Sequence, residues 1–248
     1  MPRYPYRSTS ASFSFGPGPL TPAVKVILYA NIAVFVAAFV APSIVIYLGL
    51  APVAVVERLW LWQPVTYMFV HRDLFHILFN MLALWMFGVE LERLWGTQGF
   101  TRYYFVTGVG AGLTTLLVAL LPIELAGAVY YSVTIGASGA IYGLLLAFAL
   151  IYPNRPLLFF PIPIPVPARY FVMILGAIAF LSAVGSGGGG IAHATHLGGL
   201  VVGYFYLRRG RGGLLAELKY RYLKWKMARM RKRFGVHPGG RDWTDRIH

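Results

Sequence analysis

The sequence predicts an all-α polytopic membrane protein, and its composition and charge spacing are the observations that predict this fold class. Of the 248 residues, 58% are hydrophobic and 12% are charged, and the mean hydropathy is +0.64. A soluble protein carries about 25% charged residues, so one core of this size could not bury all the apolar side chains present. The chain has no Cys, which excludes disulfides, a thiol nucleophile and Cys-ligated zinc.

Stretches without a charged residue mark the candidate transmembrane helices. A bilayer core needs roughly 20 apolar residues per helix, with a range of about 17 to 25. The last stretch is too long for one span, and the glycine-rich run 185–190 interrupts it, so it is expected to hold two helices. We therefore expect a six-transmembrane helix bundle. The five stretches are residues 26–56, 74–89, 103–123, 125–154 and 170–207.

The chain divides into three expected parts: an N-terminal tail 1–22, a six-helix domain 23–208 and a basic C-terminal tail 209–248. Lys and Arg in short loops mark the cytoplasmic side of a membrane protein. If the N-terminus is cytoplasmic, every Lys and Arg except Arg58 and Arg72 lies on that side. We expect a multi-pass protein of the cell membrane with both termini cytoplasmic. The N-terminal tail is too polar to span, and no signal peptide is expected.

The basic tail has two interpretations. Residues 219–234 interleave cations with aromatic side chains, a composition also found in nucleic-acid-binding segments. A basic amphipathic helix just inside the last span is attracted to anionic lipids, at about 1 kcal/mol per cation near the surface. We favour the lipid bilayer with its anionic lipids as the partner and expect no nucleic acid.

The polar residues that lie within the expected spans limit the chemistry. Asp occurs only at positions 73, 242 and 245, outside every span, so an intramembrane hydrolase with two aspartates is excluded. The sequence contains no H-E-x-x-H motif, which removes the usual zinc arrangement for peptide hydrolysis. No span carries an acidic residue in its middle, which disfavours a proton-coupled transporter. Ser, His, Asn and Tyr remain.

Three polar clusters lie where expected spans begin on the outer side. In the first, His76 and Asn80 are four residues apart and share one helix face. These two side chains could also simply hold helices together through hydrogen bonds. In the second, the helix from Ser138 to Tyr152, just before Pro153, is shorter than a bilayer is thick, so it is expected to start below the outer surface. Residues 127–136 are then expected to enter the membrane as irregular backbone.

The third cluster begins the last span and contains His193 and His196. These two residues could be read as a metal pair, but no carboxylate or third ligand completes the set, so no metal is expected. Gly199 and Gly203 form a G-x-x-x-G motif, which lets helices approach closely. In the second cluster, Gly139 with Gly143 forms another such motif.

Ser138 and His196 are therefore the candidate nucleophile and general base. A hydroxyl becomes nucleophilic when a base within about 2.6–3.2 Å takes its proton. Without an available Asp, we expect a dyad in which Tyr142 stacks on or braces the imidazole. The Ser138 N–H, His76 and Asn80 would donate hydrogen bonds to the oxyanion of a tetrahedral intermediate.

Three motifs occur in the order typical of one known family. The motif H-x-x-x-x-H-x-x-x-N contains His71, His76 and Asn80; G-x-S-G contains Gly136, Ser138 and Gly139, followed by Tyr142; and A-H-x-x-H-x-x-G-x-x-x-G contains His193, His196, Gly199 and Gly203. Over residues 25–208 the chain resembles a rhomboid intramembrane serine protease. The resemblance implies a six-transmembrane bundle of rhomboid type, with Ser138 as nucleophile and His196 as base. It also implies that Tyr142 packs against His196, and that His76 and Asn80 complete the oxyanion hole.

The resemblance also implies structural roles outside the site. It places the outer loop 51–73 partly in the membrane and makes 185–190 a flexible cap over the site. Some members have Arg where this chain has Gln63. Residues that look like structural family elements are Glu92, Arg93 and Gly96 after the second span, and Trp62, Gln63 and Thr66 in the first loop.

The resulting hypothesis is a serine endopeptidase that hydrolyses a peptide bond in or near a transmembrane helix of another protein, at the outer boundary of the membrane, without a cofactor. A helical substrate must first unwind, because its carbonyls are hydrogen-bonded within the helix. Substrates with Gly, Ala or Pro near the outer end should therefore be preferred. Two alternatives remain: a catalytically inactive scaffold that holds client helices, and a small channel or transporter.

Overall fold

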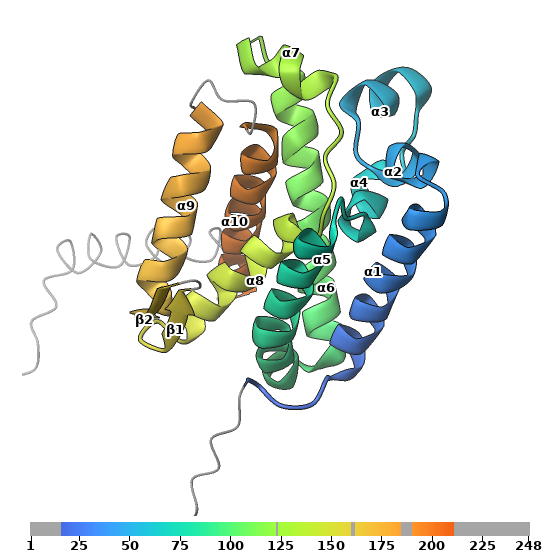
Figure 1. The fold of residues 1–248 in the computed structure, drawn as a ribbon. Coiled ribbons are helices and arrows are strands. Elements are labelled where there is room, and N and C mark those ends of the chain that lie inside the picture. Colours follow the sequence, from blue (N-terminus) through green and yellow to red (C-terminus); the bar gives the residue numbers. More distant parts are fainter. Residues whose placement is uncertain (1–15, 123, 160–161, 185–189, 211–248) are drawn as a thin grey trace, which may run out of the picture. The chain divides into compact units, whose positions relative to one another are not determined.

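The computed structural model describes residues 16–122, 124–159, 162–184 and 190–210. Residues up to Tyr204 belong to one compact unit, and a second begins at Phe205. The described part is mainly helical (Figure 1). Its elements are α1 (Pro22–Val40), α2 (Ser43–Leu48), α3 (Pro52–Arg58), α4 (Gln63–Thr66), a 3-10 turn (Tyr67–Phe69), α5 (Leu74–Ala83), a π-helical turn (Leu84–Gly88), α6 (Val89–Ala119), α7 (Glu124–Tyr130), α8 (Ser138–Ile151), β1 (Pro156–Phe159), β2 (Ile162–Pro167), α9 (Ala168–Val184) and α10 (Gly190–Gly210).

Every uncharged stretch of the sequence contains at least one helix. Two helical segments of the described chain are long and apolar enough to cross a membrane, Pro22–Val40 and Leu74–Ala119. Two shorter apolar helices, α8 and α9, are also present. The N-terminal tail to residue 15, the predicted cap at 185–189 and the basic tail from 211 lie outside the described residues.

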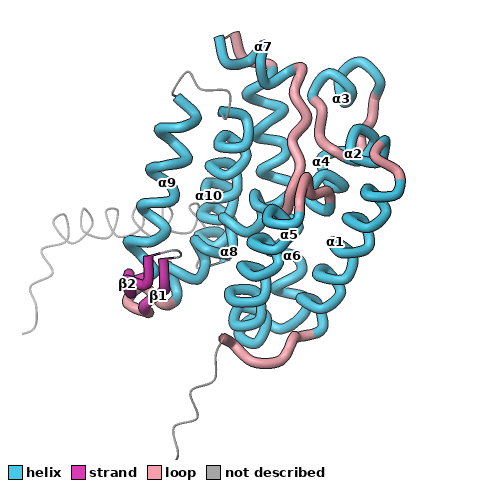
Figure 2. The backbone as a smooth tube through the Cα atoms, in the orientation of Figure 1, coloured by secondary structure: helices cyan, strands magenta, loops and turns pink. Residues whose placement is uncertain are grey.

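The second and third uncharged stretches are joined by helix instead of a loop. α5 continues through the π-helical turn into α6 (Figure 2). The backbone leaves helical geometry at Gly96, where φ is 71° and ψ is 165°. A left-handed φ of this kind suits glycine, which has no Cβ to clash with the following carbonyl. Gly96 therefore allows the change of direction between the two stretches.

One local expectation is wrong. Residues 127–136 are not all irregular, because α7 extends to Tyr130 and the irregular backbone covers only 131–137. The α7 residues include Glu, Leu and Ala, which favour helix.

The connection between α8 and α9 forms an antiparallel hairpin in which Leu157 pairs with Val166.

Buried tyrosines join α6 to the elements around the site. The Tyr67 hydroxyl donates to the Gly108 carbonyl at 2.7 Å, and the Tyr103 hydroxyl donates to the Gly143 carbonyl at 2.7 Å. Both side chains are fully buried. Each hydroxyl thus has the partner that a buried polar group requires, and α8 is fixed against α6.

Gln63 stabilises the first outer loop from within. Its side chain is fully buried. Its Oε1 accepts from the Ala51 N–H at 3.0 Å, and its Nε2 donates to the Ile46 carbonyl at 3.2 Å. Trp62 and Thr66 donate to the carbonyls of Tyr47 and Leu48. Hydrogen bonds from Gln63, Trp62 and Thr66 therefore cross-link the loop.

Glu92 caps the N-terminus of α1 from another helix. Its carboxylate accepts from the backbone N–H groups of Ala23 at 2.9 Å and Val24 at 3.0 Å. The hydroxyls of Thr21 and Thr97 donate to the same carboxylate. A helix leaves its first N–H groups without intrahelical partners, and a negative charge there also interacts favourably with the helix dipole.

Replacing Glu92 by alanine should lower the free energy of unfolding by about 2 kcal/mol or more, because buried N–H groups then lose a charged acceptor. Titration of the purified protein with SDS, followed by circular dichroism, measures this change. Glu90→Ala is the matched control, since Glu90 makes a surface ion pair with Arg155 worth about 1 kcal/mol at most. Equal losses for the two variants would contradict the capping role.

Candidate active site

Ser138 is the first residue of α8 and follows the irregular segment 131–137. The helix has 14 residues, which at about 1.5 Å per residue is shorter than a bilayer core of about 30 Å. Its first intrahelical bond runs from the Ile141 N–H to the Ala137 carbonyl at 3.1 Å. The N–H groups of the first turn, including that of Ser138, thus point out of the helix start, where they favour an anion.

The structure brings Ser138 into hydrogen-bond contact with His196 of α10. The distance from Ser138 Oγ to His196 Nε2 is 2.8 Å, across 58 positions of the chain. The other imidazole nitrogen, Nδ1, is buried and has no hydrogen-bond partner among the described residues. The geometry is that of a nucleophile and base without a third acidic member.

Two aromatic contacts hold the His196 ring. Tyr142, one turn after Ser138 on α8, stacks on the ring with centroids 4.3 Å apart and planes within 6°. His193, one turn before His196 on α10, meets the ring edge-on at 5.8 Å and 83°. The imidazole is therefore fixed by a face contact and an edge contact, which leaves Nε2 directed at the serine.

His76 lies against the backbone just before the serine. Gly136 has a φ of +114°, and a Cβ at this position would lie 2.7 Å from His76 Nε2 and 3.8 Å from Ser138 Oγ. Glycine is required at position 136 for two reasons: the positive φ of the backbone, and the close approach of the His76 imidazole to it. The Gly136 N–H donates to the Tyr67 carbonyl at 2.9 Å, which holds the segment in place.

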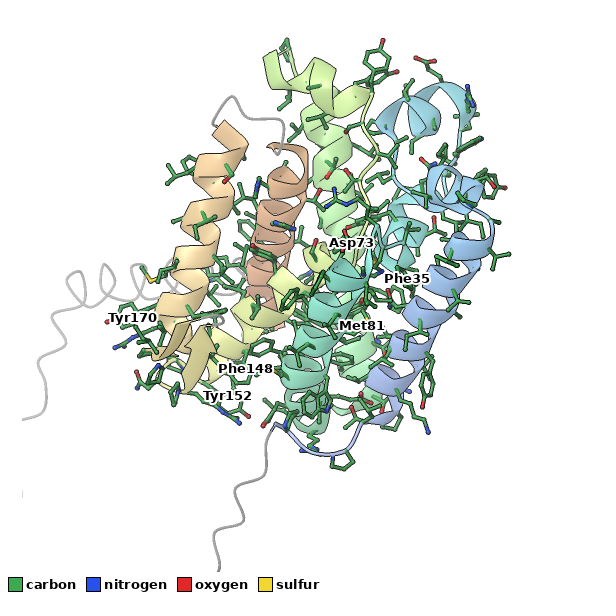
Figure 3. The ribbon with its side chains drawn as sticks, viewed as in Figure 1. Phe35, Asp73, Met81, Phe148, Tyr152 and Tyr170 are labelled. Atoms are coloured by element: carbon green, nitrogen blue, oxygen red, sulfur yellow. The ribbon has the colours of Figure 1, made fainter. Side chains whose placement is uncertain are left out.

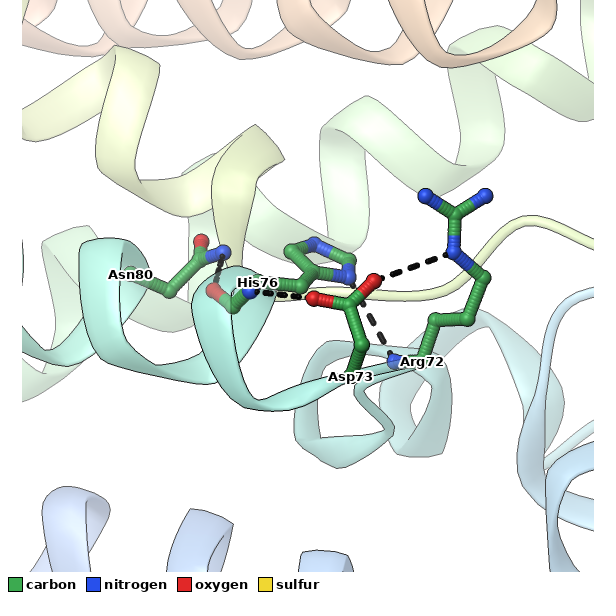
Figure 4. Close-up of polar contacts among 4 residues, drawn as sticks. All are labelled: Arg72, Asp73, His76 and Asn80. Atoms are coloured by element: carbon green, nitrogen blue, oxygen red, sulfur yellow. Dashed lines mark hydrogen bonds and ion pairs between the residues drawn. The ribbon is translucent and has the colours of Figure 1, made fainter.

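The start of α5 orients His76 (Figure 4). The His76 N–H donates to the Asp73 carboxylate at 2.8 Å, the usual N-cap bond. This bond, followed by one from the Arg72 side chain, lowers the pKa of the Asp73 carboxyl from its ordinary value. The Arg72 N–H points at His76 Nδ1 from 3.5 Å. When Nδ1 accepts, the neutral ring carries its proton on Nε2, the nitrogen that faces Gly136.

Asn80 is buried one turn after His76. Its Nδ2 donates to the His76 carbonyl at 2.7 Å (Figure 4). This bond uses one of the two amide hydrogens. His71 is also buried, with its ring edge-on to that of His76 at 4.9 Å. His71 Nδ1 lies 3.4 Å from the Phe69 carbonyl oxygen. In the first predicted cluster, His76 is thus contacted by the His71 ring and bonded through its backbone carbonyl to Asn80.

The predicted glycine motifs lie at the contact between α8 and α10. A Cβ at Gly199 would lie 2.0 Å from the Gly139 carbonyl oxygen, and a Cβ at Gly203 would lie 3.4 Å from the Gly143 Cα. The contact at Gly199 needs glycine on α10. The glycines of α8 are needed against α6, because a Cβ at Gly139 would lie 2.7 Å from the Ala111 Cβ and a Cβ at Gly143 would lie 2.7 Å from the Thr107 Cβ. Close packing of the two backbones brings Ser138 and His196 within reach of each other.

The described residues contain no group of three His, Cys, Asp or Glu side chains that could hold a metal ion. Sequence reasoning missed two contributors to the site, the Arg72 N–H and the Tyr67 carbonyl. Backbone groups carry no sequence signal, because every residue offers the same N–H and C=O.

Comparison with known proteins gives a consistent result. A model of the Rhomboid domain matches residues 58–210. Rhomboid protein 1 from mitochondria of Saccharomyces cerevisiae is 33% identical over 140 residues, which cover 56% of this chain and 38% of the relative. Rhomboid protease AarA of Providencia stuartii is 31% identical over 152 residues, covering 58% and 53%. Rhomboid protease GluP of Bacillus subtilis is 28% identical over 144 residues, covering 58% and 25%. The chain thus spans about half or less of the length of these relatives.

Proposed function

The chain belongs to the rhomboid family, whose members are helical polytopic membrane proteins, and we propose that it is an intramembrane serine endopeptidase with a Ser138–His196 dyad. The observation that carries the proposal is the 2.8 Å contact between Ser138 Oγ and His196 Nε2. The names of two relatives, rhomboid proteases AarA and GluP, support the same activity. The substrate is a transmembrane segment of another protein, cleaved near the outer face of the membrane.

In the proposed reaction, His196 Nε2 takes the Ser138 hydroxyl proton while Oγ bonds to the scissile carbonyl carbon. The carbonyl oxygen becomes an oxyanion. Collapse of this intermediate breaks the C–N bond, and Nε2 returns the proton to the leaving amine. Water then loses a proton to Nε2 and attacks the ester, and Oγ leaves with that proton. The enzyme returns to its starting state with one water consumed.

The oxyanion is stabilised by donors from two helix starts. The first-turn N–H groups of α8, including that of Ser138, are the first hydrogen-bond donors to the oxyanion. His76 supplies the second, because its Nε2 lies against Gly136 and its Nδ1 faces the Arg72 N–H. Asn80 has an amide hydrogen left over after its bond to the His76 carbonyl and supplies a third donor.

The membrane arrangement is part of the proposal. Helices α1, α5, α6, α8, α9 and α10 are the six spans of the domain 23–208, between tails 1–22 and 209–248. Both termini are cytoplasmic, because this orientation puts nearly all Lys and Arg of the loops and tails on one side. The protein lies in the cell membrane, with the basic tail on anionic lipids.

A fluorophosphonate probe tests the proposed function. The purified protein in liposomes is treated with the probe, and the labelled residue is identified by mass spectrometry. We expect one adduct, on Ser138. An inactive scaffold or a channel would give no adduct, and either that result or an adduct on another serine would overturn the dyad.

Two substitutions of Tyr142 test whether ring stacking on His196 contributes to the reaction rate. Tyr142→Phe keeps the ring over His196 and should retain cleavage within about threefold, since the parallel contact at 4.3 Å needs no hydroxyl. Tyr142→Ala removes the ring and should lower kcat about tenfold or more, because the imidazole is then held less firmly. The measurement is kcat on a single-span reporter in liposomes. Equal rates for the two variants would show that stacking is unimportant.

A further inference from the structure

The hairpin between α8 and α9 has an unusual composition for a connection between helices. All twelve of its residues, 156–167 (PLLFFPIPIPVP), lack a polar side chain. Connections usually run through water and are polar. The hairpin lies at the end of α8 and the start of α9 (Figure 1), the two shorter apolar helices of the chain. It therefore sits where apolar helices end.

The hairpin is packed at one position and open at others. Leu157 is 7% exposed and contributes to the core, whereas Ile164 is 59% exposed. Pro156 and Pro165 are also exposed. In a soluble protein, an apolar surface of this kind is covered by a binding partner. In a membrane protein, it can contact lipid instead.

The open edges of the hairpin are short of backbone donors. The Ala168 N–H bonds inward to the Arg155 carbonyl at 2.9 Å, and inward and outward groups alternate along a strand. In the observed register, the paired residues with outward backbone groups are therefore Pro156, Leu158, Pro165 and Pro167. Three of these four are proline, which has no N–H, so Leu158 alone among them has an outward donor to satisfy outside water.

The base of the hairpin is cationic and aromatic. The Arg169 N–H bonds to the Pro153 carbonyl at 3.2 Å, which places the backbones of Arg155 and Arg169 close together. The Arg155 guanidinium is paired with Glu90, while Arg169 lies over the Tyr170 ring and has no ion-pair partner among the described residues. Figure 3 shows Tyr152 and Tyr170 beside the hairpin. Arginine with tyrosine is typical of the level of lipid head groups.

We propose that the two strands of this hairpin, β1 and β2, form a membrane-interface anchor, inserted into the lipid leaflet next to the ends of α8 and α9, with Arg169 bound to anionic lipid phosphates. The free cation complements phosphate, the exposed apolar side chains complement acyl chains, and the prolines at outward positions reduce the cost of buried donors. The inference depends on the membrane fold and not on the proposed peptidase activity.

The absence of native cysteines allows a direct test. Single-cysteine variants Ile164→Cys and Asn154→Cys carry a nitroxide label in liposomes of phosphatidylcholine with phosphatidylglycerol. Asn154, exposed at the turn after α8, is the matched control. We expect the ratio of collisions with oxygen to collisions with a water-soluble nickel chelate to be at least about fivefold higher at 164 than at 154. Equal ratios would place the hairpin in water and overturn the anchor.

Two further measurements test whether lipid or protein covers the hairpin, and whether Arg169 binds anionic lipid. A label at 164 that is shielded from both quenchers, or that shows dipolar broadening, would mean that protein covers the hairpin, and would overturn the proposal. Removing phosphatidylglycerol should reduce the oxygen preference at 164, and Arg169→Gln should make the label insensitive to this change. A variant that still responds to phosphatidylglycerol would overturn the role of Arg169.

Discussion

Ser138→Ala abolishes cleavage of a tagged single-span reporter, with an expected loss of about a thousandfold or more. The reason is chemical: alanine has no oxygen to form the acyl intermediate, and His196 Nε2 loses the hydroxyl that lies 2.8 Å away. The rate is measured under single-turnover conditions in liposomes, so that substrate binding and chemistry are separated.

The matched control is Ser132→Ala. Ser132 belongs to the segment before α8, but its hydroxyl donates to the Val129 carbonyl at 2.8 Å and does not contact His196. This variant should cleave at close to the rate of the unmodified protein. The double variant Ser138→Ala/His196→Ala should be no slower than either single variant, because the two groups act as one unit. A Ser138→Ala protein that keeps a tenth of the activity would exclude the dyad.

The helical spacing of the candidate site residues is easier to predict from the sequence than the backbone around them. His76 and Asn80, or Ser138 and Tyr142, are four residues apart, and helical geometry alone puts each pair on one face. The spacing of Gly139 and Gly143 likewise indicates a close helix contact. These relations are local, so they can be read without knowing the tertiary structure.

Other features depend on contacts between distant parts of the chain. The Glu92 carboxylate accepts hydrogen bonds from N–H groups almost 70 positions earlier in the chain. The hydrophobic periodicity of the sequence does not predict a contact between residues so far apart. The hairpin was missed because alternating proline usually argues against a strand. It forms here because Pro156, Pro165 and Pro167 take outward positions, where the pairing of the two strands needs no N–H.

The closest contact between α8 and α10 gives the second large effect. Gly199→Ala would put a Cβ 2.0 Å from the carbonyl oxygen of Gly139 and 2.9 Å from its carbonyl carbon. Both are backbone atoms, which cannot rotate away as a side chain can, so α10 must move from α8. We expect the free energy of unfolding to fall by about 3 kcal/mol, the upper end of the usual overpacking cost. SDS titration with circular dichroism measures it.

The same displacement should separate the dyad, because Gly139 follows Ser138 directly. A shift of about 1 Å at a reacting group costs roughly a hundredfold in rate, so Gly199→Ala should lose both stability and cleavage. Gly127→Ala is the matched control: a Cβ there meets nothing within 4 Å, and alanine favours the α7 helix. Its stability should be unchanged or higher. If Gly199→Ala matched Gly127→Ala in stability and rate, the backbone contact would not be what holds Ser138 and His196 together.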